Sequence, residues 1–299
     1  MGKSRLTLIR VVSLVGLLFL FVFLQRVFNG EIILKQAFSV GSVSIHYYGI
    51  ILAIAAFAGI LYAKKRAPQY GLLPETVESV SLWIVFTAFF SARVYHVMTG
   101  YWRYEGHFLD ALKIWNGGLS IYGALFGGLL AIFLLKIFNS ELKKIPFLVL
   151  LDFITPAFLL GQIIGRFGNF VNYEAFGFPT LLPWKMFVPL KFRPEIYLEQ
   201  SFFHPTFLYE SLGNVLIFCF LYWFTKSSGI FSKFKANGSL FFMYLILYNC
   251  LRLFTESLRI DSVVVGNVHV NAVMSSLLVI IGVFGLIYGK RVTIKTHTN

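Results

Sequence analysis

Residues 46–66 read HYYGIILAIAAFAGILYAKKR. The stretch carries no charge from Tyr47 to Ala63, and three basic residues then follow together. A helix needs about 20 mostly apolar residues to cross the hydrocarbon core of a bilayer. The stretch therefore predicts a transmembrane helix that ends at a basic, cytoplasmic boundary.

The same pattern recurs along the chain and predicts eight spans. They cover roughly residues 8–28, 46–63, 77–97, 114–135, 145–164, 205–225, 239–257 and 268–289. Of the 299 residues, 58% are hydrophobic and only 13% are charged, whereas a soluble domain is about 25% charged. We therefore expect an all-α polytopic membrane protein, and we exclude a disordered chain and a typical cytosolic enzyme.

The basic residues are sorted between the two sides of this predicted topology. Fifteen of the 26 fall on one side, three at each of five places: residues 3–10, 64–66, 136–144, 226–235 and 290–295. This regularity predicts that this side and both termini are cytoplasmic. The other 11 include seven arginines, the residue that binds phosphate bidentately. We therefore expect an anion site towards the outer face, and no nucleic-acid partner.

The first span has a basic start and an apolar centre, like a signal peptide. No cleavage site of the A-x-A type follows it, because residues 25–30 read QRVFNG. We therefore expect an uncleaved anchor at residues 1–30, a transmembrane domain at 31–291 and a cytoplasmic tail at 292–299. Cys219 and Cys250 both lie in apolar runs, so no disulfide or cysteine-based metal site is indicated.

Seven charged residues lie in or at the ends of apolar runs. They are Arg93, Asp152, Arg166, Glu174, Glu210, Arg252 and Glu256. A charge inside a membrane costs a few kcal/mol unless it is paired or hydrated, so it is a functional candidate by default. For Arg93, Asp152 and Glu210 an internal salt bridge that locks helices together is the structural alternative, and it stays open.

Two stretches are rich in polar chemistry. Tyr248, Arg252 and Glu256 are spaced i, i+4, i+8, and with Arg259 they share one helical face; Arg252 and Glu256 are expected to pair. Residues 165–177 read GRFGNFVNYEAFG, with three glycines that permit close backbone approach. We expect residues 165–204 to be a non-helical segment that covers a site.

Together these stretches resemble the bacterial prolipoprotein diacylglyceryl transferases. Residues 165–177 match that family's signature, G-R-x-[GA]-N-F-hydrophobic-N-x-E-x-x-G, at every fixed position. Further matches follow in family order at residues 45–49, 91–93, 115–128, 152–156, 204–210 and 248–259. The resemblance implies a seven-span core in the bacterial inner membrane with its active site towards the outer leaflet. The first span would then be one added helix.

The resemblance also implies an activity. The enzyme would transfer the diacylglyceryl group of phosphatidylglycerol to the lipobox cysteine thiol of a prolipoprotein, which forms a thioether and releases glycerol phosphate. No cofactor is implied. The catalytic candidates are Arg166, Arg252, Glu256, Tyr122 and Asn169. The candidates for binding phosphatidylglycerol are Arg166, Arg252, Tyr48, Glu174, Tyr248 and His204.

The chemistry requires cations that stabilise the departing phosphate and a group that deprotonates the thiol. Candidate acceptors of the proton are Glu256, His204, Tyr122 and the phosphate itself. We expect Tyr122 to position the lipid or the thiol by a hydrogen bond instead, because a phenol is a poor base at neutral pH.

The chain departs from the family pattern at two places. Many family members have His where this chain has Tyr122. A second departure, near residues 268–272, is expected to be structural. The rival interpretations are a transferase for another lipid phosphate and a lipid transporter, which would predict inverted repeats that the sequence does not show.

Overall fold

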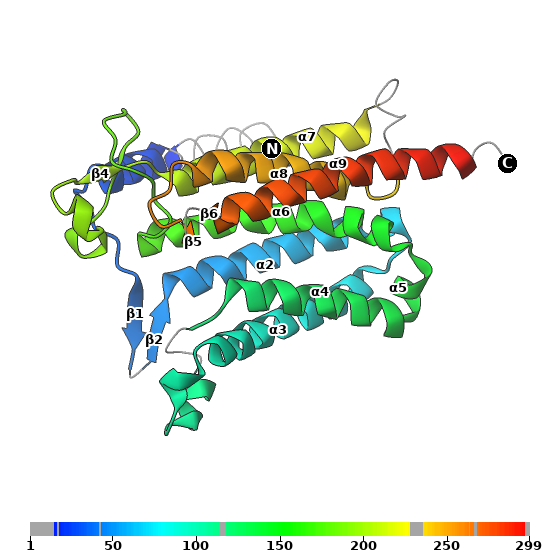
Figure 1. Cartoon of the computed structure of the whole chain (residues 1–299), viewed down its shortest axis with the longest axis horizontal. Coiled ribbons are helices and arrows are strands. Elements are labelled where there is room, and N and C mark those ends of the chain that lie inside the picture. Colours follow the sequence, from blue (N-terminus) through cyan, green and yellow to red (C-terminus); the bar gives the residue numbers. More distant parts are fainter. Residues whose placement is uncertain are drawn as a thin grey trace, which may run out of the picture.

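Long helices lie side by side along one direction, and short hairpins gather at one end of them (Figure 1). This computed structural model describes residues 15–16, 18–41, 43–113, 118–227, 236–262, 264–265 and 268–296. Its labelled helices are α2 (Tyr47–Arg66), η1 (Ala67–Tyr70), α3 (Pro74–Thr99), η2 (Tyr101–Tyr104), η3 (Phe108–Leu112), α4 (Ile121–Phe138), α5 (Ser140–Lys144), α6 (Phe147–Asn172), η5 (Leu190–Phe192), η6 (Glu195–Tyr197), α7 (Thr206–Lys226), α8 (Ser239–Glu256) and α9 (Val270–Thr296).

In the described part of the chain, three antiparallel hairpins join or precede these helices. They pair β1 (Ala37–Val40) with β2 (Val43–His46), β3 (Met186–Phe187) with β4 (Phe202–Phe203), and β5 (Val264–Val265) with β6 (Val268–His269). The hairpins lie at the left of Figure 1, which we call the hairpin end, whereas α5 and the end of α9 lie at the opposite, basic end. The described basic segments at residues 64–66, 136–144 and 290–295, which the charge pattern predicts to share a side of the membrane, therefore share an end of the bundle.

Among the described residues, five helices are long and apolar enough to cross a membrane. They cover Tyr47–Tyr70, Pro74–Thr99, Phe147–Asn172, Thr206–Lys226 and Val270–Gly289. Helices α4 and α8, of 18 residues each, occupy the predicted fourth and seventh spans. The prediction of a helical membrane protein is thus confirmed, while the number of spans stays a prediction.

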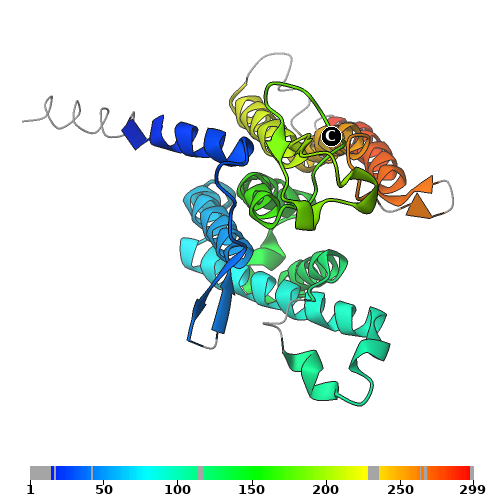
Figure 2. The same cartoon turned by 90° about the vertical axis from the view of Figure 1, so that its left-hand side faces the viewer.

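The first predicted span is only partly visible. Residues 1–14 and Leu17 lie outside the described residues, and Leu18–Phe28 forms an apolar helix. Figure 2, which views the bundle from its hairpin end, shows this helix projecting away from the other helices. Helix α4 begins at Ile121, later than the predicted residue 114, because the Ser120 side chain accepts the Gly123 N–H and caps the helix there.

The prediction that residues 165–172 are non-helical is wrong. Helix α6 continues to Asn172, because an interior glycine costs a helix only about 1 kcal/mol and Gly168 serves a close contact. A Cβ at Gly168 would lie 2.5 Å from the Tyr48 ring. Arg166, Asn169 and Asn172 therefore follow one another at spacings of three residues along the last turns of a helix, which fixes their direction far better than a loop would.

Glycines also set the packing of α4 on α3. A Cβ at Gly123 would lie 2.4 Å from the Ser91 carbonyl oxygen, and one at Gly127 would lie 2.7 Å from the Thr87 carbonyl oxygen. Small residues allow membrane helices to approach this closely. These two glycines of residues 115–128 therefore have a packing role, while residues 114–117 lie outside the described part of the chain.

Two of the seven membrane charges interact with backbone groups. Asp152 accepts the N–H groups of Gly238 at 2.7 Å and Phe241 at 2.9 Å, so it caps the N-terminus of α8 from the neighbouring helix α6. The Arg93 guanidinium donates to four carbonyl oxygens at 2.8–3.2 Å, those of residues 110, 111, 113 and 118. Asp152 thus joins two helices and Arg93 holds the loop between α3 and α4.

We expect Asp152→Ala to destabilise the protein, because two N–H groups at a buried helix end lose their acceptor. The loss of a hydrogen bond to a charged acceptor lowers the free energy of unfolding by about 1.5–3 kcal/mol. The thermal midpoint of the detergent-purified protein should therefore fall clearly. The matched control is Asp110→Ala, which removes an exposed pair with Lys113 and should cost less than about 1 kcal/mol. Equal midpoints for the two variants would contradict this role of Asp152.

Candidate active site

A buried carboxylate, that of Glu210, stands at the centre of the polar residues near the hairpin end. Glu210 lies in the first turns of α7 and is 1% exposed. One of its oxygens lies 2.6 Å from Nη1 of Arg252, and the other forms an ion pair with Nη2 of Arg166. Nη1 of Arg259 lies 3.8 Å from the first oxygen. Glu210 therefore joins three arginines from three parts of the chain.

Arg252 extends this group to a second buried carboxylate. Its Nη2 lies 2.8 Å from Glu256, which is four residues further along α8 and 4% exposed. The other oxygen of Glu256 accepts the Asn271 amide at 2.8 Å. The predicted pairing of Arg252 with Glu256 is confirmed. The departure near residues 268–272 contributes a contact to this group through Asn271, and its expected structural role stays a prediction.

Arg166 and Arg259 have further partners of their own. Arg166 donates to the Tyr248 hydroxyl at 3.2 Å, and the Tyr248 ring stacks on Tyr244 with centroids 5.4 Å apart. Arg259 follows the end of α8 and binds Asp261 through two nitrogens at 2.7 and 2.8 Å. The residues that the sequence places on one helical face therefore do meet, although α8 itself ends at Glu256.

Backbone pairing holds Arg259 in place. Gly177 forms a β-bridge with Arg259, the Phe178 N–H donates to the Leu258 carbonyl at 2.9 Å, and the His204 N–H donates to the Phe178 carbonyl at 3.0 Å. A Cβ at Gly177 would lie 2.6 Å from the Leu258 carbonyl oxygen. The last glycine of the signature run therefore permits the contact that brings Arg259 to Glu210.

The exposed charge of this group is mainly positive. The side chains of Arg166, Arg252 and Arg259 are 18%, 14% and 13% exposed, whereas those of Glu210 and Glu256 are 1% and 3% exposed. The glutamates balance the arginines from inside the protein, where an unpaired charge would be very costly. We name the five residues Arg166, Glu210, Arg252, Glu256 and Arg259 the ion-pair cluster. An anion that approaches the cluster meets guanidinium groups first.

The remaining signature residues lie beside the cluster. Asn169 is one turn beyond Arg166 on α6 and is half-buried, and the described residues offer its amide no hydrogen-bond partner. Glu174 accepts the Asn172 amide. It also lines a pocket of about 240 Å³ together with Asp261, the partner of Arg259. Tyr48 lies against Gly168. Tyr48 and Asn169 therefore lie along the end of α6 that carries Arg166, and Glu174 shares a pocket with the partner of Arg259.

His204 lies in a short chain of hydrogen bonds outside the cluster. Trp184 Nε1 donates to the Tyr209 hydroxyl at 2.7 Å, and that hydroxyl lies 3.0 Å from Nδ1 of His204. Burial lowers the pKa of His204 below its usual value, so the imidazole is neutral at pH 7. Tyr122 belongs to α4, but its side chain lies outside the described part of the structure.

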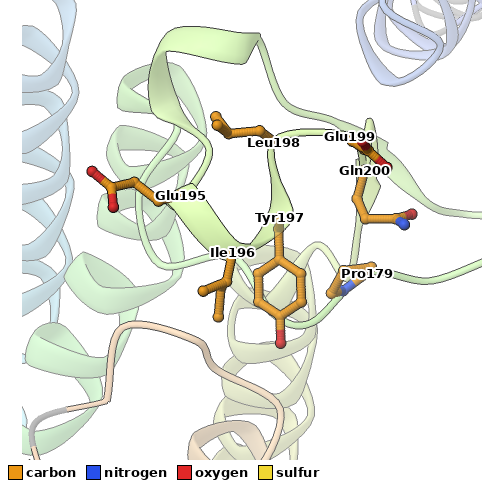
Figure 3. Close-up of a pocket in the computed structure, with 7 residues that line it drawn as sticks. All are labelled: Pro179, Glu195, Ile196, Tyr197, Leu198, Glu199 and Gln200. Atoms are coloured by element: carbon orange, nitrogen blue, oxygen red, sulfur yellow. The ribbon is translucent and has the colours of Figure 1, made fainter.

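A larger pocket, of about 610 Å³, lies away from these residues. It is lined by Pro179 and residues 195–200 of the segment between α6 and α7. Figure 3 shows the Tyr197 ring between Ile196 and Pro179, with the Glu195 carboxylate directed away from them. None of the predicted site residues lines this pocket. We therefore place the candidate active site at the ion-pair cluster.

Comparisons with known proteins agree with the signature. A family model described as prolipoprotein diacylglyceryl transferase matches residues 35–288. A phosphatidylglycerol–prolipoprotein diacylglyceryl transferase from Thermotoga maritima is 40% identical over 284 residues, which cover 94% of this chain and 93% of that relative. One from Fervidobacterium nodosum is 37% identical over 294 residues, which cover 97% and 98%. The chain therefore belongs to the prolipoprotein diacylglyceryl transferase family.

Proposed function

We propose that this chain transfers the diacylglyceryl group of phosphatidylglycerol to the lipobox cysteine thiol of a prolipoprotein. The reaction forms a thioether, releases glycerol phosphate and begins lipoprotein maturation. Membership of the family supports the proposal. The observation that carries it is the ion-pair cluster, whose arginines are the partly exposed members and whose glutamates are sealed inside. A lipid phosphate is the anion that a membrane offers to such a site.

The cluster suits the charge changes of this reaction. The thiolate sulfur forms a bond to a glyceryl carbon, and the bond from that carbon to the phosphate oxygen breaks. The departing phosphate takes the electron pair, and we assign Arg166 and Arg252 to stabilising it. Because carboxylates already hold both guanidinium groups, these donors need little rearrangement as the charge develops, which is the condition for electrostatic catalysis.

The contacts of the candidate bases favour different roles for them. Glu256 has one oxygen on Arg252 and the other on Asn271, so both of its oxygens already have partners. We therefore assign Glu256 to positioning Arg252. Tyr48, Asn169, Glu174, Tyr248 and His204 are assigned to binding the lipid around the phosphate. The neutral His204, Tyr122 and the phosphate itself remain candidate acceptors of the thiol proton.

We infer that the enzyme lies in the bacterial inner membrane with the ion-pair cluster towards the outer leaflet. The positive-inside rule supports this orientation, since residues 64–66 and the α5 lysines lie at the end of the bundle opposite the hairpins. An eight-span arrangement follows, with an anchor at residues 1–30, a transferase domain at 31–291, and both termini, including the tail at 292–299, in the cytoplasm.

Cysteine labelling tests this orientation. In a background of Cys219→Ser and Cys250→Ser, we expect Ser39→Cys at the hairpin end to react with a membrane-impermeant maleimide in intact spheroplasts. Lys143→Cys in α5 should react only after the membrane is permeabilised. Both positions are exposed in the structure, so access to solvent differs only by side. The reverse pattern would place the hairpin end in the cytoplasm.

The activity is tested with purified full-length protein in lipid nanodiscs. We expect transfer from phosphatidylglycerol labelled in its acyl chains to a lipobox peptide, with a mass increase on the cysteine and release of glycerol phosphate. A peptide with Ser in place of the cysteine should remain unmodified. Transfer from a polyprenyl phosphate instead would favour a transferase for another lipid phosphate. Lipid translocation without any product would favour a lipid transporter.

Arg252→Lys tests the role of the cluster. Lysine keeps the charge but loses the fork that contacts Glu210 and Glu256 together. We expect kcat/KM to fall about 30- to 150-fold, which corresponds to about 2–3 kcal/mol, while the protein still inserts and folds. Arg26→Lys is the matched control at an exposed arginine. Activity near that of the wild type would reduce Arg252 to a residue that pairs helices.

Tyr122→Phe separates positioning from base catalysis. If the hydroxyl only positions lipid or thiol, its loss should cost about 1–3 kcal/mol, or roughly a 5- to 150-fold decrease in rate. The pH–rate profiles of the wild type and the variant should then have the same shape and differ only in height. A wild-type limb near pH 9–10 that disappears in Tyr122→Phe would instead identify the phenol as the base.

A further inference from the structure

The end of the first helix and the extended segment at residues 31–36 that follows it are built into the core at the hairpin end. Val27 is 1% exposed and packs in one cluster with seven other buried residues: Phe170, Tyr173, Phe176, Met186, Val188, Phe203 and Phe207. The ring of Phe28 packs 5.7 Å from Phe170 and 6.3 Å from Phe207. These contacts join residues at the start of the chain to the end of α6 and the start of α7.

Two long-range hydrogen bonds continue this contact along the segment. The Leu34 N–H donates to the Tyr173 hydroxyl at 2.8 Å, and the Gln36 side chain donates to the Asn172 carbonyl at 3.0 Å. Lys35, between them, is exposed. Both acceptors belong to the place where α6 ends within the signature run. The segment therefore contacts the signature through alternate residues, as an extended chain does.

The part of the signature that receives these bonds has an unfavourable backbone. Tyr173 and Ala175 adopt φ values of 55° and 54°, in the left-handed region. Residues other than glycine occupy this region only where surrounding contacts hold them there. Glu174 lies between the two, and Asn172 donates to its carboxylate. Contacts that hold Asn172 and Tyr173 therefore also fix the direction of Glu174.

We propose that Val27, Phe28, Leu34 and Gln36 form a brace that positions the signature loop at residues 172–175. The brace lies almost entirely before the residues that match the family model, which begin at residue 35. It requires the first helix to be retained, because removal of residues 1–30 would take Val27 and Phe28 out of the buried cluster. Its effect on catalysis rests on the proposed function, in which Glu174 binds the lipid.

Hydrogen exchange measured by mass spectrometry tests the brace without reference to activity. Gln36→Leu removes the donor to Asn172, and Tyr173→Phe removes the acceptor of the Leu34 N–H but keeps the ring stacked on Phe192. We expect peptides that cover residues 170–178 to exchange about fivefold faster in each variant, as the loss of one hydrogen bond implies. Lys35→Leu, the matched control at an exposed position of the same segment, should exchange like the wild type.

Steady-state kinetics give the second measurement. A loosened Glu174 should raise KM for phosphatidylglycerol about fivefold and leave kcat within about twofold, because binding is affected and the arginines are not. A general loss of folding would instead lower the fraction of active protein, and the apparent kcat would fall with it. Unchanged exchange at residues 170–178 in both variants would overturn the brace. So would a fully active enzyme whose intact mass shows that it begins after residue 30.

The two proposals can fail separately. If the wild type transfers no lipid but both variants exchange faster at residues 170–178, the proposed function is wrong and the brace is supported. If transfer is normal and exchange is unaffected by either variant, the function stands and the brace is wrong.

Discussion

The buried carboxylate of Glu210 is the constraint on which the rest of the site depends. An uncompensated charge in a membrane protein's interior costs several kcal/mol, so a residue that is 1% exposed must bring cations to it. Arg166 arrives from α6, Arg252 from α8 and Arg259 from the turn after α8. The packing of α7 against α6 and α8 and the position of the cations therefore depend on each other.

The sequence predicts most of the fold because the bilayer imposes strong patterns. Apolar runs of fixed length predict the helices, and the basic residues predict which loops share an end. Arg252, Glu256 and Arg259 could be brought together from their spacing alone. Helix α6 is the main error: the three glycines of residues 165–177 suggest a loop, but Gly168 is inside a helix because the Tyr48 ring occupies the space of a side chain.

The site could be predicted only in part, because its contacts are long-range. Periodicity places residues on the face of one helix, but it cannot show that Glu210 meets Arg166 and Arg252, which are 44 and 42 positions away. The same limit applies to Asn271, which approaches Glu256 from the start of α9. A charge count also cannot distinguish Glu210 from Asp152. Both are buried acids in helices, yet Asp152 is satisfied by backbone N–H groups and Glu210 by arginines.

This difference between the two acids separates a structural charge from one suited to chemistry. The partners of Asp152 are peptide groups at a helix end, which cannot leave without unwinding the helix. The partners of Glu210 are side chains with five donors each, and they keep a partly exposed surface after pairing. In the function that we propose, an incoming phosphate can therefore share these arginines without displacing Glu210. The carboxylate holds the guanidinium groups in place before the anion arrives, so the cost of orienting them falls on folding and not on the reaction.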